Sequence, residues 1–268
     1  MIWSRADADP IPNLSRMRKI MPFISPRRNE SLVLHSTEIL LNPAFAFLAE
    51  QNASRAADRR LTLFHLYLRA AELAIRTRSG VNRFVAGGRL WQRNHVALTF
   101  SAKQEMLDGS PMITVKRIFP EHESLDEMVD AIHELLLERR RGRETRSDRE
   151  MKFALQMPPL LIRLGVWALH RANMWGLLPR TMIDDDPLFT SLFIANLGSV
   201  GLEAGYHHLW EYGTCSLFGV VGAIKERADG EKYMIVNYSY DERIEDGLYA
   251  AISLDVIKES LENPEKLL

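Results

Sequence analysis

The run from Ser239 to Gly247 (SYDERIEDG) constrains the fold of this chain more than any other segment. It overlaps the end of an alternating segment, Tyr233 to Tyr240, which has the pattern of a half-buried β-strand. It precedes an amphipathic segment, Gly247 to Leu261, which is typical of a helix and is closed by Asn263-Pro264. Asp246 suits the cap of that helix, because an aspartate side chain accepts hydrogen bonds from the first free amides. The sequence therefore predicts a strand, a charged turn and a helix in direct succession.

Alternating and apolar runs predict further strands, and segments with helical periodicity separate them. The expected strands are Ser31–Ile39, Val96–Ala102 and Met112–Ile118 around a turn at Asp108-Gly109, Phe189–Asn196, Ser216–Ile224, and a hairpin turning at Gly87-Gly88. The expected helices run from Asn42 to about Gln51, from Leu61 to Thr77, and from the Ser124–Glu127 capping box to about Arg141. We find no internal repeat and no low-complexity linker, so one domain over residues 1–268 is the simplest organisation.

Composition and charge exclude several classes of partner. The chain has 268 residues, of which 46% are hydrophobic and 26% charged, enough for a sizeable core. Its formal net charge of −1 favours neither nucleic acid nor an anionic surface, so no nucleic-acid partner is expected. Cys215 is the only cysteine, which excludes an internal disulfide and indicates a cytoplasmic protein. Residues 1–29 lack a secretory apolar region and are expected to form an irregular N-terminal arm.

Residues 143–187 contain an unusually apolar segment that follows a charged one. Arg139 to Glu150 is almost wholly charged and is expected to be an exposed connection. From Pro158 to Leu178 the strongly polar side chains fall on one side of a helix, and they are Arg163, His170, Arg171 and Asn173. Charges at mid-segment disfavour a membrane span. Three roles stay open for 158–178: an ordinary packing interface, the wall of a hydrophobic acceptor pocket, or peripheral contact with a membrane through Trp167 and Trp175.

Four segments resemble, in order and spacing, the catalytic domain of dihydrolipoyl acyltransferases, the core components of 2-oxoacid dehydrogenase complexes. They are Leu68–Ala74 with Gly80-Val81-Asn82, the strand and turn Phe193–Gly198 (FIANLG), the run Asp241–Gly247, and the tail Leu261–Leu268. The run has Asp-Glu-Arg-x-x-Asp-Gly where the family has Asp-His-Arg-x-x-Asp-Gly. Each motif is short, but four in the right order are specific. The resemblance covers roughly residues 13 to 268, with 143–187 as an insertion that is atypical of the family.

The resemblance implies an α/β fold like that of chloramphenicol acetyltransferase, a two-layer sandwich in which helices cover a mixed sheet. It also implies a homotrimer, which in the family can build a larger cage, with active sites in channels between subunits. Coenzyme A or an acyl-CoA would enter from one side and a small-molecule acceptor from the other. Complete family members carry lipoyl and subunit-binding modules ahead of this domain. The sequence has no room for them, so we expect no lipoyl attachment in this chain.

Both chemical positions of the family differ here. The family histidine, which deprotonates the acceptor, is replaced by Glu242, and the serine that stabilises the oxyanion is replaced by Ala195, next to Asn196. Losing one oxyanion donor costs about 2.7–4 kcal/mol of transition-state stabilisation. A glutamate would act as a base near pH 7 only if burial raised its pKa by about two units. The other interpretation of Glu242 is an ion pair with Arg243 or with an arginine of another subunit. Asp246 keeps the architectural role of the family aspartate.

The segment Tyr206–Tyr212 (YHHLWEY) is dense in titratable groups. His208 and Glu211 are three residues apart and would share a face on a helical turn, so His208 is a candidate substitute base. The candidate pocket residues are His207, Glu211, Tyr212 and Arg243. The two histidines could instead ligate a metal, but no ligand set with metal spacing accompanies them, and no metal is expected. The interpretation we favour is an aromatic–histidine packing cluster at a subunit interface.

Two hypotheses of function follow. The first is a CoA-dependent acyltransferase-like protein with a remodelled site between subunits, acting on an unknown hydrophobic acceptor. The second is a non-catalytic trimeric or cage-forming assembly or binding protein that has lost the histidine base and the oxyanion serine.

Overall fold

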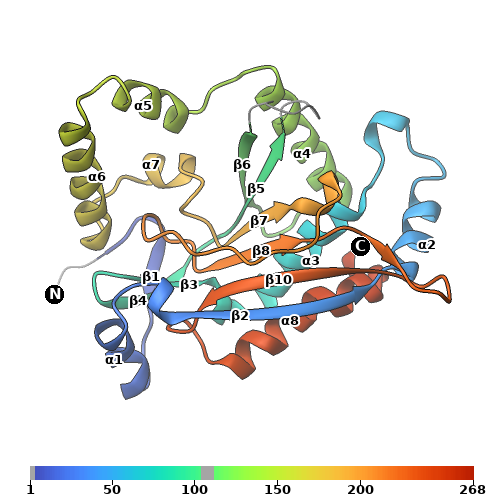
Figure 1. The fold of residues 1–268 in the computed structure, drawn as a ribbon, viewed down its shortest axis with the longest axis horizontal. Coiled ribbons are helices and arrows are strands. Elements are labelled where there is room, and N and C mark those ends of the chain that lie inside the picture. Colours follow the sequence, from blue (N-terminus) through green and yellow to red (C-terminus); the bar gives the residue numbers. More distant parts are fainter. Residues whose placement is uncertain (1–3, 104–111) are drawn as a thin grey trace.

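The computed structural model describes residues 4–103 and 112–268 (Figure 1). The expected turn at Asp108-Gly109 lies outside the described residues. Within them, the main sheet has seven strands. Six follow the order β2 (Leu32–Leu40), β10 (Lys232–Asp241), β8 (Leu217–Val221), β7 (Leu192–Asn196), β5 (Val96–Lys103) and β6 (Met112–Phe119), and β9 (Lys225–Glu226) pairs with β10. The sheet is mixed, because β7 is parallel to both β5 and β8 while the other pairs are antiparallel.

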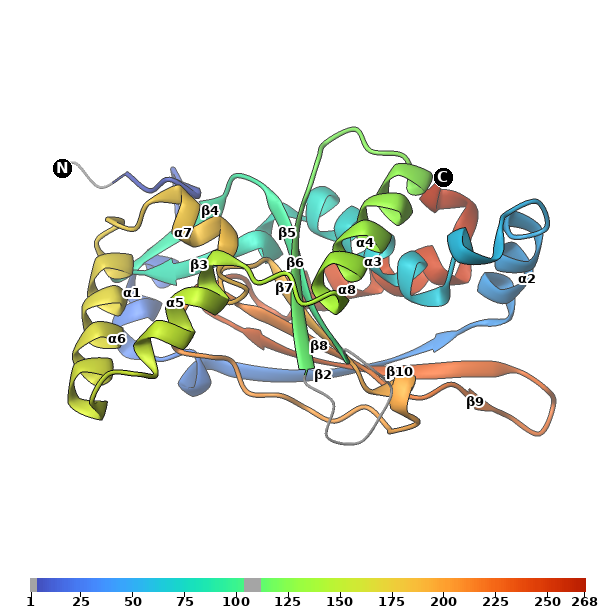
Figure 2. The same ribbon diagram turned by 90° about the horizontal axis from the view of Figure 1, so that it is seen from above.

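Four helices cover one face of this sheet and form the second layer (Figure 2). They are α2 (Asn42–Gln51), α3 (Leu63–Thr77), α4 (Leu125–Arg140) and α8 (Gly247–Glu262). The apolar stripe of α3 is buried against inward-facing residues of β5, β7, β8 and β10. The Thr62–His65 and Ser124–Glu127 capping boxes begin α3 and α4. The expected α/β sandwich with a mixed sheet is therefore confirmed.

The opposite face of the sheet is covered in part by a segment without regular structure. Leu209 and Cys215 from this segment are buried against Phe193 of β7 and Phe218 of β8. The rings of Phe193 and Phe218 are stacked, with centroids 5.1 Å apart. The 206–212 segment therefore lies on the face of the sheet that the helices leave uncovered.

The N-terminal arm is more ordered than expected. It contains β1 (Ala8–Pro10) and α1 (Arg16–Ile24), which Ser15 caps by accepting a hydrogen bond from the Arg18 amide. β1 pairs with β4 (Arg89–Arg93), and β4 pairs with β3 (Arg83–Ala86), to give a second, small sheet. Proline and charge in residues 1–29 indicated irregular chain, but edge pairing with β4 and a serine cap order it.

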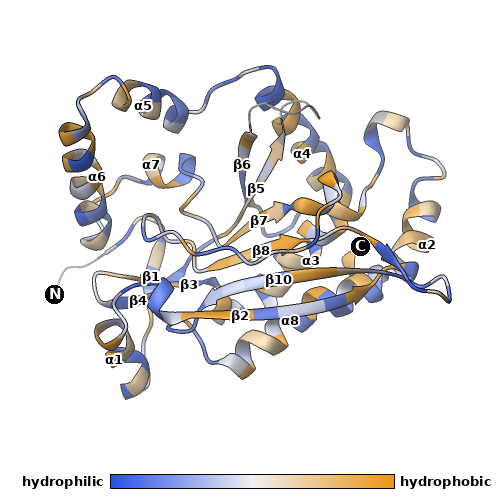
Figure 3. Ribbon diagram, viewed as in Figure 1, coloured by the Kyte–Doolittle hydropathy of each residue, from blue (hydrophilic) through white to orange (hydrophobic). Residues whose placement is uncertain are grey.

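Residues 143–187, expected from the sequence to be an insertion, form three helices grouped at one end of the molecule, far from α2 (Figure 1). They are α5 (Arg146–Ala154), α6 (Pro159–Met174) and α7 (Arg180–Asp185). The expected exposed connection at 139–150 is wrong in part, because α4 extends to Arg140 and a Thr145–Asp148 capping box begins α5. Figure 3 shows apolar turns along α6, and Leu160, Leu164 and Trp167 are exposed on it. No helix among the described residues has the length and apolar character needed to cross a membrane.

Candidate functional site

The turn Glu242–Asp246 follows β10, and we call it the signature turn. The N-terminal part of the chain holds it in place. The Glu242 amide donates to the Ser31 carbonyl at 2.9 Å, which continues the pairing of β10 with β2 past Asp241. The Arg18 guanidinium donates to the Glu242 carbonyl at 2.6 Å. These contacts fix the backbone of Glu242 from two sides and leave its side chain free to point elsewhere.

Arg243 is buried beneath this turn and forms an ion pair with Asp241. Its Nε and Nη2 donate to the two carboxylate oxygens at 2.8 and 2.7 Å, and its Nη1 donates to the Ser25 carbonyl. The side chains of Arg243 and Asp241 are 2% and 0% exposed. The expected pairing of Arg243 with Glu242 is therefore wrong, and so is its assignment as a pocket residue. Nε, Nη1 and Nη2 of this guanidinium each donate a hydrogen bond inside the fold.

The Glu242 side chain is half-buried and stands without a partner. In the part of the chain that the structure describes, no group forms a hydrogen bond or ion pair with its carboxylate. Its charge is nevertheless felt by Tyr240, whose pKa is raised, first by burial and then by the carboxylates of Glu242 and Asp246. Asp246 caps α8, where its Oδ1 accepts a hydrogen bond from the Tyr249 amide at 2.8 Å. The cap expected at Asp246 is present, whereas Glu242 retains an unpaired carboxylate.

The Ala195–Asn196 turn ends β7. Ala195 is half-buried and offers only a methyl group, and Asn196 caps the short 3-10 helix Leu197–Val200 by accepting a hydrogen bond from the Ser199 amide at 3.1 Å. The Ser199 hydroxyl, which sequence reasoning missed, donates back to the Asn196 carbonyl at 2.7 Å. Asn196 and Ser199 line a cavity of about 220 Å³ with Thr62 and Tyr67 of the α3 region. The turn therefore has a serine hydroxyl four residues after Ala195, and that hydroxyl is hydrogen-bonded to the backbone.

Gly198 and Gly222 bring this turn against the end of β8. A Cβ added at Gly198 would lie 2.3 Å from the Gly222 carbonyl oxygen, and one added at Gly222 would lie 2.7 Å from the Ala204 amide nitrogen. Both contacts are with backbone, which cannot move aside as a side chain can. Glycine is therefore required at this crossing of the turn and strand.

Gly198→Ala should destabilise the fold by about 1–3 kcal/mol, the usual cost of forcing extra volume into a packed site. The free energy of unfolding, measured in urea, tests this. Gly165→Ala is the matched control, because a Cβ at Gly165 of α6 has nothing within 4 Å and alanine favours a helix. A loss for Gly198→Ala no larger than that of the control would contradict the close approach.

The strand register separates the two chemical positions within one chain. Ala195 of β7 lies opposite Val220 of β8, and Val220 lies opposite Asn237 of β10. Glu242 is five residues beyond Asn237, which is about 16 Å along a strand at about 3.3 Å per residue. One copy therefore cannot bring Glu242 and the Ala195–Asn196 turn to the same reacting atom. A site containing both requires a second copy of the chain.

The two histidines lie in an aromatic packing cluster, as the sequence predicts, and the subunit interface expected there stays a prediction. The His207 ring stacks on Phe218 with centroids 4.2 Å apart and on His208 at 4.4 Å. Trp210 packs against both histidine rings. Burial lowers the pKa of His207, the His208 carbonyl at its Nδ1 acts to raise it, and the neighbouring His208 lowers it further. His207 is consequently a neutral packing residue at pH 7.

Glu211 points away from His208, so the expected helical pairing of these two residues is wrong. The segment has no helical turn, and the Glu211 carboxylate accepts hydrogen bonds from the Arg28 amide and from the amide and side chain of Asn29. Burial acts to raise the pKa of Glu211, but these hydrogen bonds and the Arg28 charge together lower it. The lone carboxylate therefore ties the segment to the N-terminal arm and is unsuited to proton transfer.

Tyr212 lies apart from the histidines, beside the inserted helices. Its ring packs edge-to-face on Phe189 with centroids 5.7 Å apart, and the Asp186 carboxylate acts with burial to raise the pKa of its hydroxyl. Among the described residues, no group of three or more His, Cys, Asp or Glu side chains is placed to hold a metal ion. Cys215 is buried, and burial raises the pKa of its thiol. The 206–212 segment therefore has three separate parts. His207 and His208 pack with aromatic rings, Glu211 binds the N-terminal arm, and Tyr212 lines the pocket beside α5 and α6.

The fold is shared with acyltransferases of known structure. A probable dihydrolipoamide acetyltransferase from Listeria monocytogenes superposes with a TM-score of 0.60 at 16% identity, over 95% of each chain. The cubic core of a pyruvate dehydrogenase multienzyme complex gives 0.61 at 15% identity, over 97% of this chain and 99% of that one. A chloramphenicol acetyltransferase gives 0.56 at 14% identity, over 95% and 99%. The fold expected from the four motifs is thereby confirmed.

Sequence comparison adds no closer relative. No protein-family model matches the chain, and a search of curated proteins finds no match. The chain therefore has a divergent sequence on the fold of the dihydrolipoamide and chloramphenicol acetyltransferases.

Proposed function

We propose that the protein is a CoA-dependent acyltransferase whose active site forms between subunits of a homotrimer. Glu242 of one subunit would face the Ala195–Asn196 turn of another. The observation that carries this proposal is the unpaired Glu242 carboxylate, which lies in an intact signature turn but about 16 Å along the sheet from the turn it must serve. Likeness of fold to the cubic core of a multienzyme complex supports assembly from several copies.

In this proposal Glu242 accepts the proton of the acceptor hydroxyl or thiol as the acceptor attacks the thioester carbonyl of an acyl-CoA. The tetrahedral intermediate then expels the CoA thiolate, which takes up the proton. Ala195 contributes no side-chain donor to the oxyanion, so this turn offers one hydrogen-bond donor fewer than a serine at that position would give. The reaction is therefore expected to be slow, and slowest for acceptors with poorly acidic protons.

Glu242→Gln should lower release of free thiol by at least about 10²-fold, the usual contribution of a general base. Purified protein would be incubated with a panel of acyl-CoAs, with and without candidate acceptors, and free thiol would be measured over time. Glu226→Gln is the matched control, because Glu226 is an exposed glutamate on β9. Equal rates for the two variants would refute the role of Glu242, and absence of CoA binding by calorimetry would refute the enzyme altogether.

A second candidate is a non-catalytic trimeric or cage-forming assembly protein. The observation that favours it is Ala195, which removes the side-chain donor from a turn whose backbone geometry is otherwise preserved by Asn196 and Gly198. A trimer or larger species by native mass measurement, together with no CoA binding, would support this candidate over the enzyme. A monomer would contradict both.

A further inference from the structure

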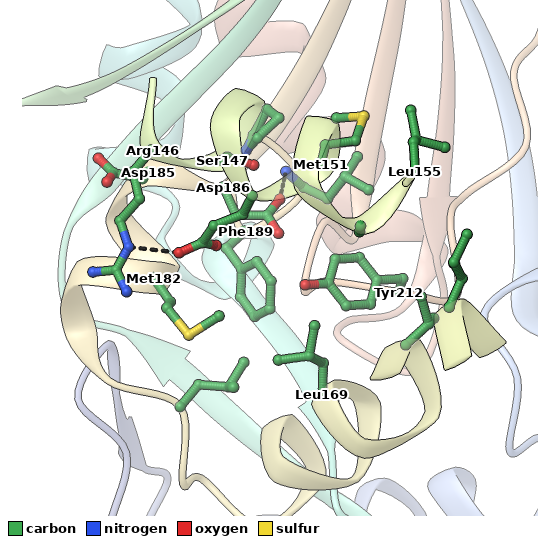
Figure 4. A pocket seen from close by; sticks show the side chains of 17 residues that line it. Arg146, Ser147, Met151, Leu155, Leu169, Met182, Asp185, Asp186, Phe189 and Tyr212 are labelled. Atoms are coloured by element: carbon green, nitrogen blue, oxygen red, sulfur yellow. Dashed lines mark hydrogen bonds and ion pairs between the residues drawn. The ribbon is translucent and has the colours of Figure 1, made fainter. Parts of the chain in front are cut away.

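Helices α5, α6 and α7 line an open pocket that acyl transfer leaves unexplained. It measures about 390 Å³ and lies between α5, α6, α7 and the 187–189 turn (Figure 4). Its walls are mostly apolar, with Met151 and Leu155 from α5, Ile162 and Leu169 from α6, and Phe189 at the floor. Binding sites for small molecules commonly measure about 300–1,000 Å³ and have such walls. The cavity has the size and lining of a site for one small apolar molecule.

The cavity is framed by anchored elements. Its floor is continuous with a buried cluster of Leu178, Ile183 and Phe189, and Tyr212 packs edge-to-face on that phenylalanine. Its roof, α5, is held at its start by an ion pair between Arg139 and Asp148 and by a hydrogen bond from Arg146 to the Thr181 hydroxyl at 3.3 Å. Helices from both ends of the insertion are thus tied around a space that no side chain fills.

The polar groups of the cavity are predominantly acidic. Arg146 is its one basic residue, and it is engaged by Glu150 at 2.6 Å. Asp186 is half-buried, and its Oδ1 accepts a hydrogen bond from the Leu188 amide at 2.8 Å. Burial raises the pKa of Asp186, and burial together with that carboxylate raises the pKa of the Tyr212 hydroxyl. Asp185 has no hydrogen-bonding or ionic partner within residues 4–103 and 112–268.

We propose that this cavity binds a small aliphatic amine, with the alkyl chain against α5 and α6 and the ammonium group beside Asp185 and Asp186. An apolar wall gives affinity for the alkyl chain, and the Asp185 carboxylate at its edge gives preference for a positive head over a neutral or negative one. Carboxylate ligands such as fatty acids meet three acidic side chains and one basic group that is already paired. The inference stands whether or not the protein transfers acyl groups.

Calorimetric titration with octylamine, octanol and octanoate at pH 7 tests the proposal, because the three share a tail and differ in head charge. Octylamine should bind at least tenfold more tightly than octanol, and octanoate should show no binding. Butylamine should bind at least tenfold more weakly than octylamine, since it leaves much of the apolar wall unfilled. Octanoate binding as tightly as octylamine, or no difference between butylamine and octylamine, would overturn the proposal.

Two variants and one control locate the site. Ala154→Trp fills the cavity from α5 and should abolish octylamine binding, whereas Ala168→Trp on the exposed side of α6 should leave it unchanged. Asp185→Asn, at an exposed position that the fold does not use, should reduce the preference of the protein for octylamine over octanol to less than threefold. Circular dichroism would confirm that each variant is folded. Octylamine binding that survives Ala154→Trp, or a preference over octanol that is unchanged in Asp185→Asn, would refute the site.

Discussion

Arg243→Ala is expected to destabilise the protein by about 3–5 kcal/mol, the cost of leaving a buried charge without its partner. The change removes both hydrogen bonds to the Asp241 carboxylate, which has no exposed surface and cannot recruit water in exchange. It also frees the Ser25 carbonyl, which Arg243 holds at 2.9 Å. Urea unfolding measured by fluorescence gives the free energy directly. Few single substitutions elsewhere in the chain should cost as much.

Two further variants distinguish the stability effect of the buried Arg243–Asp241 pair from the effect of removing any arginine. Arg227→Ala removes an arginine that pairs with Glu38 and Glu231 at the surface, and it should change stability little. Replacing both members, Arg243→Met with Asp241→Leu, should recover part of the loss, because no unpaired charge remains in the interior. A loss below about 1 kcal/mol for Arg243→Ala would show that the pair is solvated.

Ala195→Ser combined with Glu242→His should raise the rate of acyl transfer by at least about 10²-fold. A serine hydroxyl at the oxyanion position is worth about 10²–10³ in rate, and a histidine titrates close to neutral pH where a glutamate ordinarily does not. The expectation rests on the proposed function. It uses backbone geometry that the chain has kept: the Asn196 cap, the Gly198 crossing and the anchored turn at Glu242. Thiol release from the acyl-CoA panel measures the effect.

The single variants show how the two positions cooperate. Because the positions meet only between subunits, mixing separately purified Ala195→Ser and Glu242→His proteins should yield intermediate rates once subunits exchange. Ala168→Ser controls for a serine added at an exposed position. A folded double variant that binds CoA, assembles as a trimer and shows no gain in rate would mean that the two positions do not share a site.

The sequence predicted most of the framework because local patterns determine it. The Ser124–Glu127 box, the Gly87-Gly88 hairpin and the alternation of Tyr233–Tyr240 each have a short-range physical cause, and each was found as expected. The α5 helix is not predicted, because a run as highly charged as 139–150 is typical of an exposed loop. Arginine and glutamate are good helix formers, and the Arg146–Glu150 pair lies four residues apart on that helix.

The candidate site was less predictable because long-range contacts determine it. Spacing alone suggested that His208 and Glu211 share a face, but Arg28 and Asn29, some 180 residues earlier, draw Glu211 away. Adjacency suggested that Arg243 pairs with Glu242, but the side chain turns inward to Asp241. The cavity of the insertion required helices α5 to α7 to be placed in space, which periodicity cannot supply. The apolar run at 158–178 was its only signal.

The contacts that hold the signature turn also set an order for events during synthesis. Arg18 and its acceptor, the Glu242 carbonyl, are 224 residues apart, and Arg243 reaches back to Ser25 across a similar span. At a synthesis rate of about 5–20 residues per second, Arg18 is made roughly 11 to 45 s before the turn to which it donates its hydrogen bond. During that interval β2 lacks β10, the strand with which it pairs. Completion of β10 and of the turn after it is therefore the step that gives β2 its partner and fixes the N-terminal arm, and α8 can then pack on α3 and β2.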